Sequence, residues 1–318
     1  MTCIPWLAAL PLFLTLVRAD APNPVAPGRI QHLEDFQSRY LNPRNVDVWL
    51  PEGYPQPGTR YAVLYMHDGQ NLFDPAKAAY GVAWEVDSTL AALGQRNEIR
   101  PCIVVGIWNT PKRFAEYTPA KPFNELPPAQ RNQLLLERPG APLSDAYLKF
   151  IVKELKPYVD RHYRTSPRRA DTFIAGSSMG GLISLYAALE YPKVFGGAAC
   201  FSTHWPLSLK ENSPAFTQGM VRYLDQKLPR SRKPRLYFDH GSATLDAWYA
   251  PHQVRIDSVL RAHGYAPDRW VTRTFPGAAH NEAAWKKRVP LAMQFLLGNG
   301  LDAMKLQKAQ PLGNPNEK

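Results

Sequence analysis

Short apolar runs alternate with segments of helical periodicity from about residue 60 onward. Apolar stretches rich in β-branched and aromatic residues predict buried strands over 61–66, 102–107, 172–175, 197–201, 235–239 and 269–275. Apolar positions that recur every three or four residues predict helices over 84–93, 144–163, 181–191, 214–228, 251–263 and 282–297. This alternation predicts an α/β protein with a mostly parallel sheet and helices on both faces.

The N-terminal part of this pattern is different. Residues 29–40 and 45–50 alternate apolar and polar side chains, which predicts an antiparallel pair at one edge of the sheet. The expected total is about eight strands in one domain over residues 20–308, followed by a flexible tail at 309–318. With 45% hydrophobic and 20% charged residues, the composition is that of a globular protein and excludes a disordered chain.

Residues 118–143 interrupt the alternation. They hold six prolines and no strand pattern, and they lie between a predicted strand and the long helix 144–163. A loop of about 25 residues within a compact domain usually has a function or lacks fixed structure. We therefore expect a proline-rich flap loop at the rim of the site, with a simple linker as the alternative.

The N-terminus predicts export. Ile4–Val17 is an apolar run of 14 residues, shorter than the ~20 that a membrane-spanning helix needs. Small residues at Val17 and Ala19 predict cleavage of a signal peptide, residues 1–19, and a mature protein that starts at Asp20 in the periplasm or outside the cell. An uncleaved anchor or a buried N-terminal helix is the alternative. No later run is long enough to predict integral membrane association.

Cysteines and charge add little to this interpretation. Cys102 and Cys200 lie within apolar strand-like runs, which favours two free buried thiols over a disulfide. Removing residues 1–19 takes away Arg18 and no acid, which lowers the net charge from +11 to +10. The basic runs at 230–235 and 286–288 carry no aromatic interleaving, so they predict solvated loops and no nucleic-acid partner.

The strongest chemical signal is Gly176-Ser-Ser-Met-Gly-Gly181, between a predicted strand and a predicted helix. Gly-x-Ser-x-Gly in this context is typical of a nucleophile elbow, where Ser178 would sit on a sharp turn at the start of the helix. Glycines at 176 and 180 remove side chains that would collide there. The amide of Met179 could then stabilise an oxyanion. The alternative is a tight turn in which Ser178 only caps the helix.

A nucleophilic serine needs a base and an orienting acid, which follow it along the chain in this kind of fold. His280 lies just after the last predicted strand and is the expected base. Two carboxylates follow strand 235–239, and both Asp239 and Asp246 qualify as the acid. Asp246 lies beyond a glycine turn and is preferred, because the chain there can reach His280.

A second oxyanion donor is expected after strand 61–66, in the segment His67-Asp-Gly-Gln-Asn-Leu-Phe-Asp74. The amide of Gln70 is the preferred donor. His67, Asp68 and Asp74 could also be considered as metal ligands. Their spacing matches no known ligand set, so neither a metal nor another cofactor is expected.

Five segments together resemble the Putative esterase family of the α/β hydrolases, which includes esterase D-like, feruloyl, acetylxylan and enterochelin esterases and mycolyltransferases. They are YMHDGQNLFD (65–74), YLKFIVKELKPYVDRHYRT (147–165), IAGSSMGGLISLYAALEYPKVFG (174–196), FDHGSATLD (238–246) and GAAHNEAAW (277–285). The resemblance implies the α/β-hydrolase fold, with Ser178 as nucleophile, Asp246 as acid and His280 as base. It implies an oxyanion hole made by the amides of Gln70 and Met179.

The function expected from these residues is hydrolysis of a carboxylic ester through an acyl-enzyme. Acyl transfer to a sugar or lipid hydroxyl and a non-catalytic binding protein are the two alternatives. The substrate is expected to be a small-molecule, carbohydrate or siderophore ester. The side chains expected to line its pocket are His67, Asp68, Trp108, His204 and Trp205.

Overall fold

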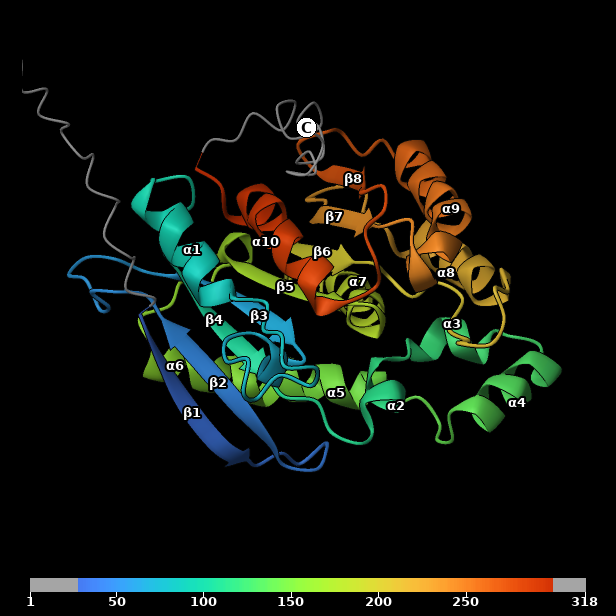
Figure 1. Ribbon diagram of the computed structural model, residues 1–318, viewed down its shortest axis with the longest axis horizontal. Helices are drawn as coiled ribbons and strands as arrows, with labels where there is room; N and C mark the ends of the chain where they lie inside the picture. The colour runs from blue at the N-terminus through green and yellow to red at the C-terminus, as the bar shows by residue number, and fades with distance from the viewer. Residues whose placement is uncertain (1–27, 300–318) are drawn as a thin grey trace, which may run out of the picture.

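The computed structural model describes residues 28–299, which form an α/β fold around one eight-stranded sheet (Figure 1). The spatial order is β1-β2-β4-β3-β5-β6-β7-β8, and only the β1–β2 and β2–β4 pairs are antiparallel. The strands are β1 (Arg29–Phe36), β2 (Arg44–Leu50), β3 (Ala62–His67), β4 (Cys102–Ile107), β5 (Thr172–Ser177), β6 (Gly197–Phe201), β7 (Arg235–His240) and β8 (Trp270–Thr274). The predicted sheet and its antiparallel edge are confirmed.

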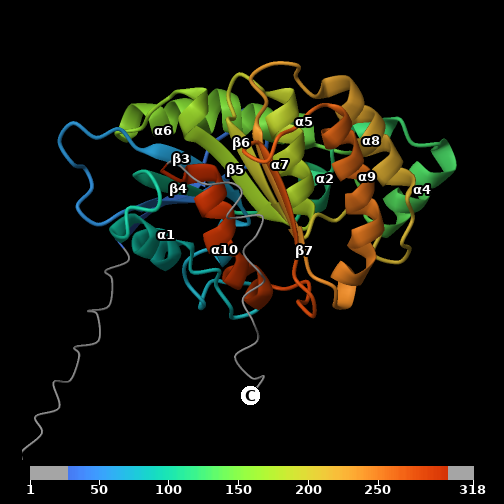
Figure 2. The same ribbon diagram turned by 90° about the horizontal axis from the view of Figure 1, so that it is seen from above.

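Helices cover both faces of the sheet (Figures 1 and 2). The first face carries α1 (Val86–Gln95) and α10 (Glu282–Leu297). The second face carries α5 (Ser144–Phe150), which continues through a π-helical turn (Ile151–Leu155) into α6 (Lys156–His162), with α7 (Met179–Glu190), α8 (Ala215–Lys227) and α9 (Tyr249–Ala262). All the helices expected from periodicity form.

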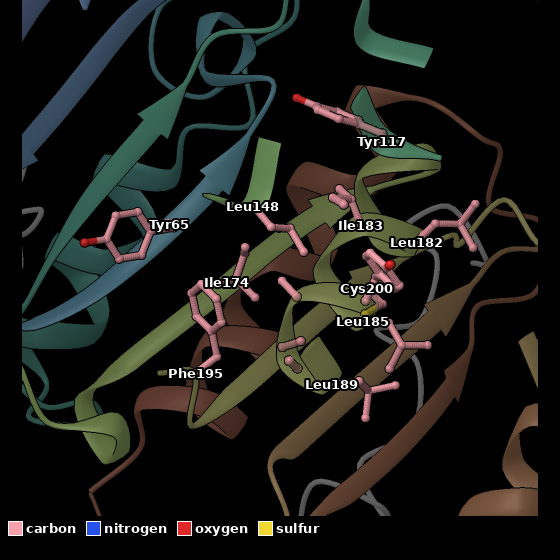
Figure 3. Close-up of a cluster of buried hydrophobic side chains, with 14 of the residues drawn as sticks. Tyr65, Tyr117, Leu148, Ile174, Leu182, Ile183, Leu185, Leu189, Phe195 and Cys200 are labelled. Atoms are coloured by element: carbon pink, nitrogen blue, oxygen red, sulfur yellow. The ribbon is translucent and has the colours of Figure 1, made fainter. Parts of the chain in front are cut away.

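Each face of the sheet has its own apolar core, because successive side chains of a strand point to opposite faces. Along β3, Val63 and Tyr65 belong to the larger core while Leu64 and Met66 belong to the smaller one. Figure 3 shows the larger core around α7, to which Leu182, Ile183, Leu185 and Leu189 of this helix belong. The central strands are buried on both faces, which explains their unbroken apolar sequences.

Residues 118–143 differ from the sequence-based expectation. Instead of a structureless loop, the segment holds α3 (Ala120–Asn124) and α4 (Pro128–Glu137), directly after α2 (Arg113–Tyr117). Proline favours the first turn of a helix, where its missing N–H is not needed, and here Pro127 and Pro128 begin α4. Pro119 likewise is the N-cap of α3, so three of the six prolines mark helix starts.

Both described cysteines, Cys102 and Cys200, are free and buried, as predicted. Burial raises the pKa of Cys102 to about 12 and raises that of Cys200 as well, so neither thiol is a reactive group at neutral pH. The expected signal peptide and tail lie outside the described residues. Between residues 28 and 299 no helix combines the length and the apolar character needed to cross a bilayer.

A buried ion pair joins the antiparallel edge to α2. Arg44 on β2 donates two hydrogen bonds of 2.8 Å to the carboxylate of Glu116, and both side chains are almost fully buried. The guanidinium also stacks over the rings of Tyr147 and Phe150. Bidentate geometry and aromatic contacts offset the cost of removing two charges from water.

We predict that Glu116→Ala lowers the free energy of unfolding by about 3–5 kcal/mol, because it leaves the Arg44 charge buried without a partner. Urea unfolding measures this loss. The matched control is Glu125→Ala, which breaks a solvent-exposed pair with Arg222 and should cost at most about 1 kcal/mol. Equal losses in the two variants would contradict the prediction.

Candidate active site

Ser178 occupies a sharp turn between β5 and α7. Its backbone angles, φ 58° and ψ −119°, are unusual for a residue with a side chain. A Cβ on Gly176 would lie 2.9 Å from the ring of His67 and 3.0 Å from the backbone of Gly180, so this turn closes only with glycine at 176. The strand–turn–helix geometry that the sequence pattern predicts is therefore present around Ser178.

His280 lies in the loop after β8 and is held by Asp246, which lies in the loop after β7. Its Nδ1–H donates a hydrogen bond of 2.6 Å to Asp246 Oδ1, and this leaves Nε2 as the ring nitrogen available to other groups. The two loops also bind each other directly, since the amide of His280 donates to Thr244 Oγ1 at 2.8 Å. This mutual binding fixes the register between the acid and the imidazole.

The second oxygen of Asp246 is bound just as closely. Oδ2 accepts hydrogen bonds from Ser202 Oγ at 2.6 Å and from the amide of Gly241 at 2.5 Å. Burial alone would raise the pKa of Asp246, but the hydrogen bonds from His280 and Ser202 outweigh it and lower that pKa. Asp246 is therefore a charged acceptor that orients His280.

Asp239, the other acid considered from the sequence, has different partners. At the end of β7 its Oδ1 lies 3.2 Å from Arg288 Nη1 and accepts from the amide of Ser202, and its Oδ2 accepts from Tyr237. Burial raises the pKa of Asp239, and the opposing charge of Arg288 only partly compensates. No contact joins Asp239 to His280 within the described chain.

Arg288 and Ser202 connect these two carboxylates. The guanidinium is 1% exposed, donates to Ser202 Oγ at 2.9 Å and lies 3.9 Å from Asp246 Oδ2. Ser202 Oγ also accepts from the indole N–H of Trp285 at 2.9 Å. We call Ser202, Asp239, Asp246 and Arg288 the buried charge cluster.

A cavity of about 630 Å³ opens beside these groups at the carboxyl end of the sheet. Its polar walls include Ser178, His280 and the first residue of α10, Glu282. Further lining side chains come from the ends of β3 and β4, from the 71–84 segment and from α2 and α10: His67, Asp68, Asn71, Leu72, Tyr80, Val82, Trp84, Asn109, Arg113 and Trp285. Ser178 and His280 thus line the same cavity. No hydrogen bond joins their side chains within residues 28–299.

His67 and Asp68 line the cavity but are bound by neighbouring groups. Burial lowers the pKa of His67 to about 3, so its ring is neutral, and its Nδ1 contacts the hydroxyl of Tyr147 at 2.8 Å. Asp68 receives two hydrogen bonds from Arg113, at 2.6 and 2.8 Å, and one from Asn109. Burial opposes ionisation of Asp68, but the charge of Arg113 wins and lowers the pKa of Asp68.

Three residues expected in the pocket do not line this cavity. Trp108 donates to Asp47 and packs its ring edgewise against His32, near the antiparallel edge. Trp205 is fully buried and donates to Gln253. His204 is equally buried, and its Nδ1 contacts the Tyr249 hydroxyl at 2.8 Å. Trp205 and His204 are thus bound within buried surroundings, whereas Trp108 is half-buried at the antiparallel edge.

Gln70 and Met179 occupy the two helix starts at which the oxyanion donors are expected. Gln70 lies in the 3₁₀ turn Gly69–Asn71 after β3, and Met179 is the first residue of α7. A Cβ on Gly69 would lie 2.4–2.5 Å from the carbonyl of Gly106, so glycine lets this turn approach β4. Amides in the first turn of a helix have no acceptor within that helix and are available to bind an anion.

A family model described as Putative esterase matches residues 38–296, most of the chain. The chain belongs to the Putative esterase family. With this membership it is a carboxylic ester hydrolase, and its fold is of the α/β-hydrolase type. Between residues 28 and 299 this esterase has no group of three or more His, Cys, Asp or Glu side chains placed to hold a metal ion.

Individual relatives are distant from this esterase in sequence. The uncharacterized protein YbbA of Bacillus subtilis is 24% identical over 262 residues, which cover 80% of this chain and 93% of YbbA. The ferri-bacillibactin esterase BesA of Bacillus subtilis is 28% identical over 167 residues, 49% of this chain and 54% of BesA. The esterase therefore aligns along nearly all of YbbA but along only about half of BesA.

Solved structures share its fold. A ferulic acid esterase superposes with a TM-score of 0.60 at 18% identity, covering 85% of this chain and 98% of that structure. The enterobactin esterase of Shigella flexneri superposes with a TM-score of 0.61 at 19% identity, covering 86% of this chain and 60% of that structure. At these identities the superpositions establish the fold alone.

The sequence of this esterase indicates Asp239 and Asp246 but not the other two members of the buried charge cluster, Ser202 and Arg288. Arg288 belongs to the basic run 286–288, which was interpreted as a solvated loop, whereas the run lies on α10 and Arg288 points into the core. The helical period holds the available signal, because Arg288 lies three residues after Trp285 and four before Ala292, on the buried face of α10. Ser202 carries no comparable signal, since it is a single hydroxyl after a strand.

We predict that Arg288→Met lowers the free energy of unfolding by about 3–5 kcal/mol at pH 7, because two buried carboxylates lose their cation. An acid whose pKa is higher in the folded state than in the unfolded state destabilises the folded protein when the pH lies above its unfolded-state pKa. This destabilisation disappears as the acid is protonated. The deficit should therefore shrink as the pH falls from 7 towards about 4, the ordinary pKa of an aspartate, as measured by urea unfolding. Lys287→Met, an exposed position on the same helix, should show neither effect.

Proposed function

We propose that this esterase uses Ser178 as nucleophile, His280 as general base and Asp246 as the orienting acid. The observation that carries the proposal is the 2.6 Å hydrogen bond from His280 Nδ1 to Asp246 Oδ1, at a cavity that Ser178 also lines. Because Nδ1 carries the proton in this bond, the free lone pair of the ring is on Nε2, the nitrogen that must take the serine proton. Hydrogen bonds between nucleophile and base are often long in the absence of substrate and tighten when it binds.

The reaction follows in two steps. His280 Nε2 takes the Ser178 proton as Oγ attacks the ester carbonyl, and the resulting imidazolium gives this proton to the leaving alcohol. Water then attacks the acyl-enzyme with the same imidazole as base, which releases the acid and restores Ser178. Asp246 stays ionised throughout and stabilises the imidazolium.

The oxyanion of each tetrahedral intermediate needs at least two donors. We propose that these are the amides of Gln70 and Met179. Both belong to residues at helix starts, and Gln70 Oε1 accepts from the amide of Asn109 at 3.2 Å, which restrains its side chain. The positive end of α7 adds to the stabilisation of negative charge at Ser178.

The proposed substrate is a small-molecule ester that carries a ring. Tyr80, Trp84 and Trp285 supply flat apolar walls to the cavity. Its relatives include a ferri-bacillibactin esterase and its structural neighbours include a ferulic acid esterase, which supports phenolic, sugar-linked or siderophore esters as the classes to test first. We further propose that residues 1–19 direct export of the protein to the periplasm or out of the cell, and that the protein meets such esters there.

Replacing the proposed nucleophile tests the assignment directly. Ser178→Ala should lower kcat on p-nitrophenyl acetate by roughly 10⁴–10⁶, as loss of a catalytic serine does in other hydrolases. A fluorophosphonate probe should label the native protein at Ser178 and leave the variant unlabelled. A folded variant that keeps more than about 1% of the native kcat would contradict the assignment.

The two acids are separated by a pair of amide substitutions. Asp246→Asn should lower kcat by about 10⁴, because a neutral amide no longer holds His280 in the required tautomer. Asp239→Asn should reduce kcat by less than about ten-fold, since Asp239 acts on Arg288 and not on the imidazole. Steady-state kinetics on p-nitrophenyl acetate give both values, and a larger loss for Asp239→Asn would reverse the assignment.

A further inference from the structure

Glu282 is a buried carboxylate in the cavity wall that none of the steps above uses. It is the first residue of α10, follows the N-cap Asn281 and is 8% exposed. Within residues 28–299 its carboxylate has no side-chain hydrogen bond or ion pair; its own amide is its hydrogen-bond partner, and the charges of Asp68, His280 and Arg113 act on it from a greater distance. A buried carboxylate ordinarily has partners, because burial without them is costly.

The other charged groups of the cavity wall are satisfied within the protein. Asp68 is bound by Arg113 and Asn109, and His280 is bound by Asp246. Burial raises the pKa of Glu282 and the negative charge of Asp68 adds to this, while its own amide and the positive charges of His280 and Arg113 only partly compensate. The wall beside α10 therefore carries an acceptor that no other side chain of residues 28–299 binds.

We propose that Glu282 selects the ester substrate by accepting a hydrogen bond from a substrate hydroxyl and by rejecting esters that carry an anionic group at that position. This inference rests on the proposed function of the cavity, and it adds a specificity-determining residue to it. Trp285 follows Glu282 by three residues on the same helix, and Trp84 packs against Trp285 at 5.6 Å between ring centroids. A hydroxyl carried on a ring can therefore meet the carboxylate while the ring contacts the indoles.

The charges nearby favour a neutral donor over a cation. Arg113 lines the same cavity, and His280 becomes positively charged as each proton is transferred. An ammonium group on the substrate would be attracted to Glu282 but repelled by both of these groups, whereas a hydroxyl meets no such repulsion. An anionic substituent would instead meet the like charge of Glu282.

The experiment compares two substitutions at Glu282 on matched esters. Glu282→Gln removes the charge and keeps an acceptor oxygen, whereas Glu282→Met removes both at similar size. The probes are methyl cinnamate with its 4-hydroxy and 4-carboxy derivatives, and phenyl acetate with the same two substituents, so that both the acyl and the alcohol side are tested. Comparing the same kcat/KM ratio between the native enzyme and each variant cancels differences in intrinsic ester reactivity.

In at least one of the two series, the native enzyme should prefer the hydroxyl ester and discriminate against the carboxylate ester relative to the unsubstituted one. Glu282→Gln should relieve the discrimination against the carboxylate ester by about ten-fold or more, and Glu282→Met should abolish the preference for the hydroxyl ester. A carboxylate ratio in Glu282→Gln within about two-fold of the native ratio in both series, or a hydroxyl preference that survives in Glu282→Met, would overturn the proposal.

Glu85→Gln is the matched control. Glu85 is a surface carboxylate that pairs with Lys286 on α10 at 2.5 Å and does not line the cavity. The kcat/KM ratios of Glu85→Gln should equal the native ratios. Ratios shifted as in Glu282→Gln would show that the effect comes from general surface charge and would overturn the proposal. Circular dichroism and urea unfolding verify that each variant is folded. Failure of the triad itself is recognised separately, by a Ser178→Ala variant that still hydrolyses unsubstituted phenyl acetate.

Discussion

Arg288 is a buried cation with two carboxylates around it, and one of these, Asp246, also binds the imidazole of His280. Removing a guanidinium from water is costly, so the surrounding groups must supply hydrogen bonds and opposite charge. Asp239 from β7, Asp246 from the following loop and Ser202 from the end of β6 do so, while Arg288 itself belongs to α10. These contacts join four separate segments of the chain beside His280.

The parallel sheet explains why residues so far apart in sequence meet at all. All its parallel strands end at one edge, so the turns after β3, β5, β7 and β8 deliver their side chains to the same place. The strand order puts β3 next to β5, which brings His67 against Gly176 and closes the turn beneath Ser178. The short elbow after β5 is strained, whereas the long loops after β7 and β8 can adjust to meet it. This division lets one rigid turn present the hydroxyl while two mutually bonded loops present the imidazole.

Sequence patterns predict those parts of this protein that repeat with a regular period. The buried strands and amphipathic helices came out close to their observed bounds, and the Gly-x-Ser-x-Gly turn has the expected geometry. The helices within 118–143 were missed, because proline at a helix start and proline in a loop look alike in sequence. Trp205 was assigned to the pocket and lies in the core, since a large ring after a strand suits either place. Such choices are decided by long-range packing, which no local pattern contains.

The carboxylates at the site are of two kinds: those paired within the chain and one, Glu282, that no other side chain binds. Asp68, Asp239 and Asp246 each have a cation or several donors within the chain, so their charges fix local geometry. Glu282 has no side-chain partner among the described residues, and the groups that favour its charge only partly offset the effect of burial on its pKa. Locally unfavourable groups of this kind are common at functional sites, where a bound ligand supplies the missing hydrogen bond or charge. The difference between a paired and an unpaired buried charge therefore separates the groups that hold the site from those that face its substrate.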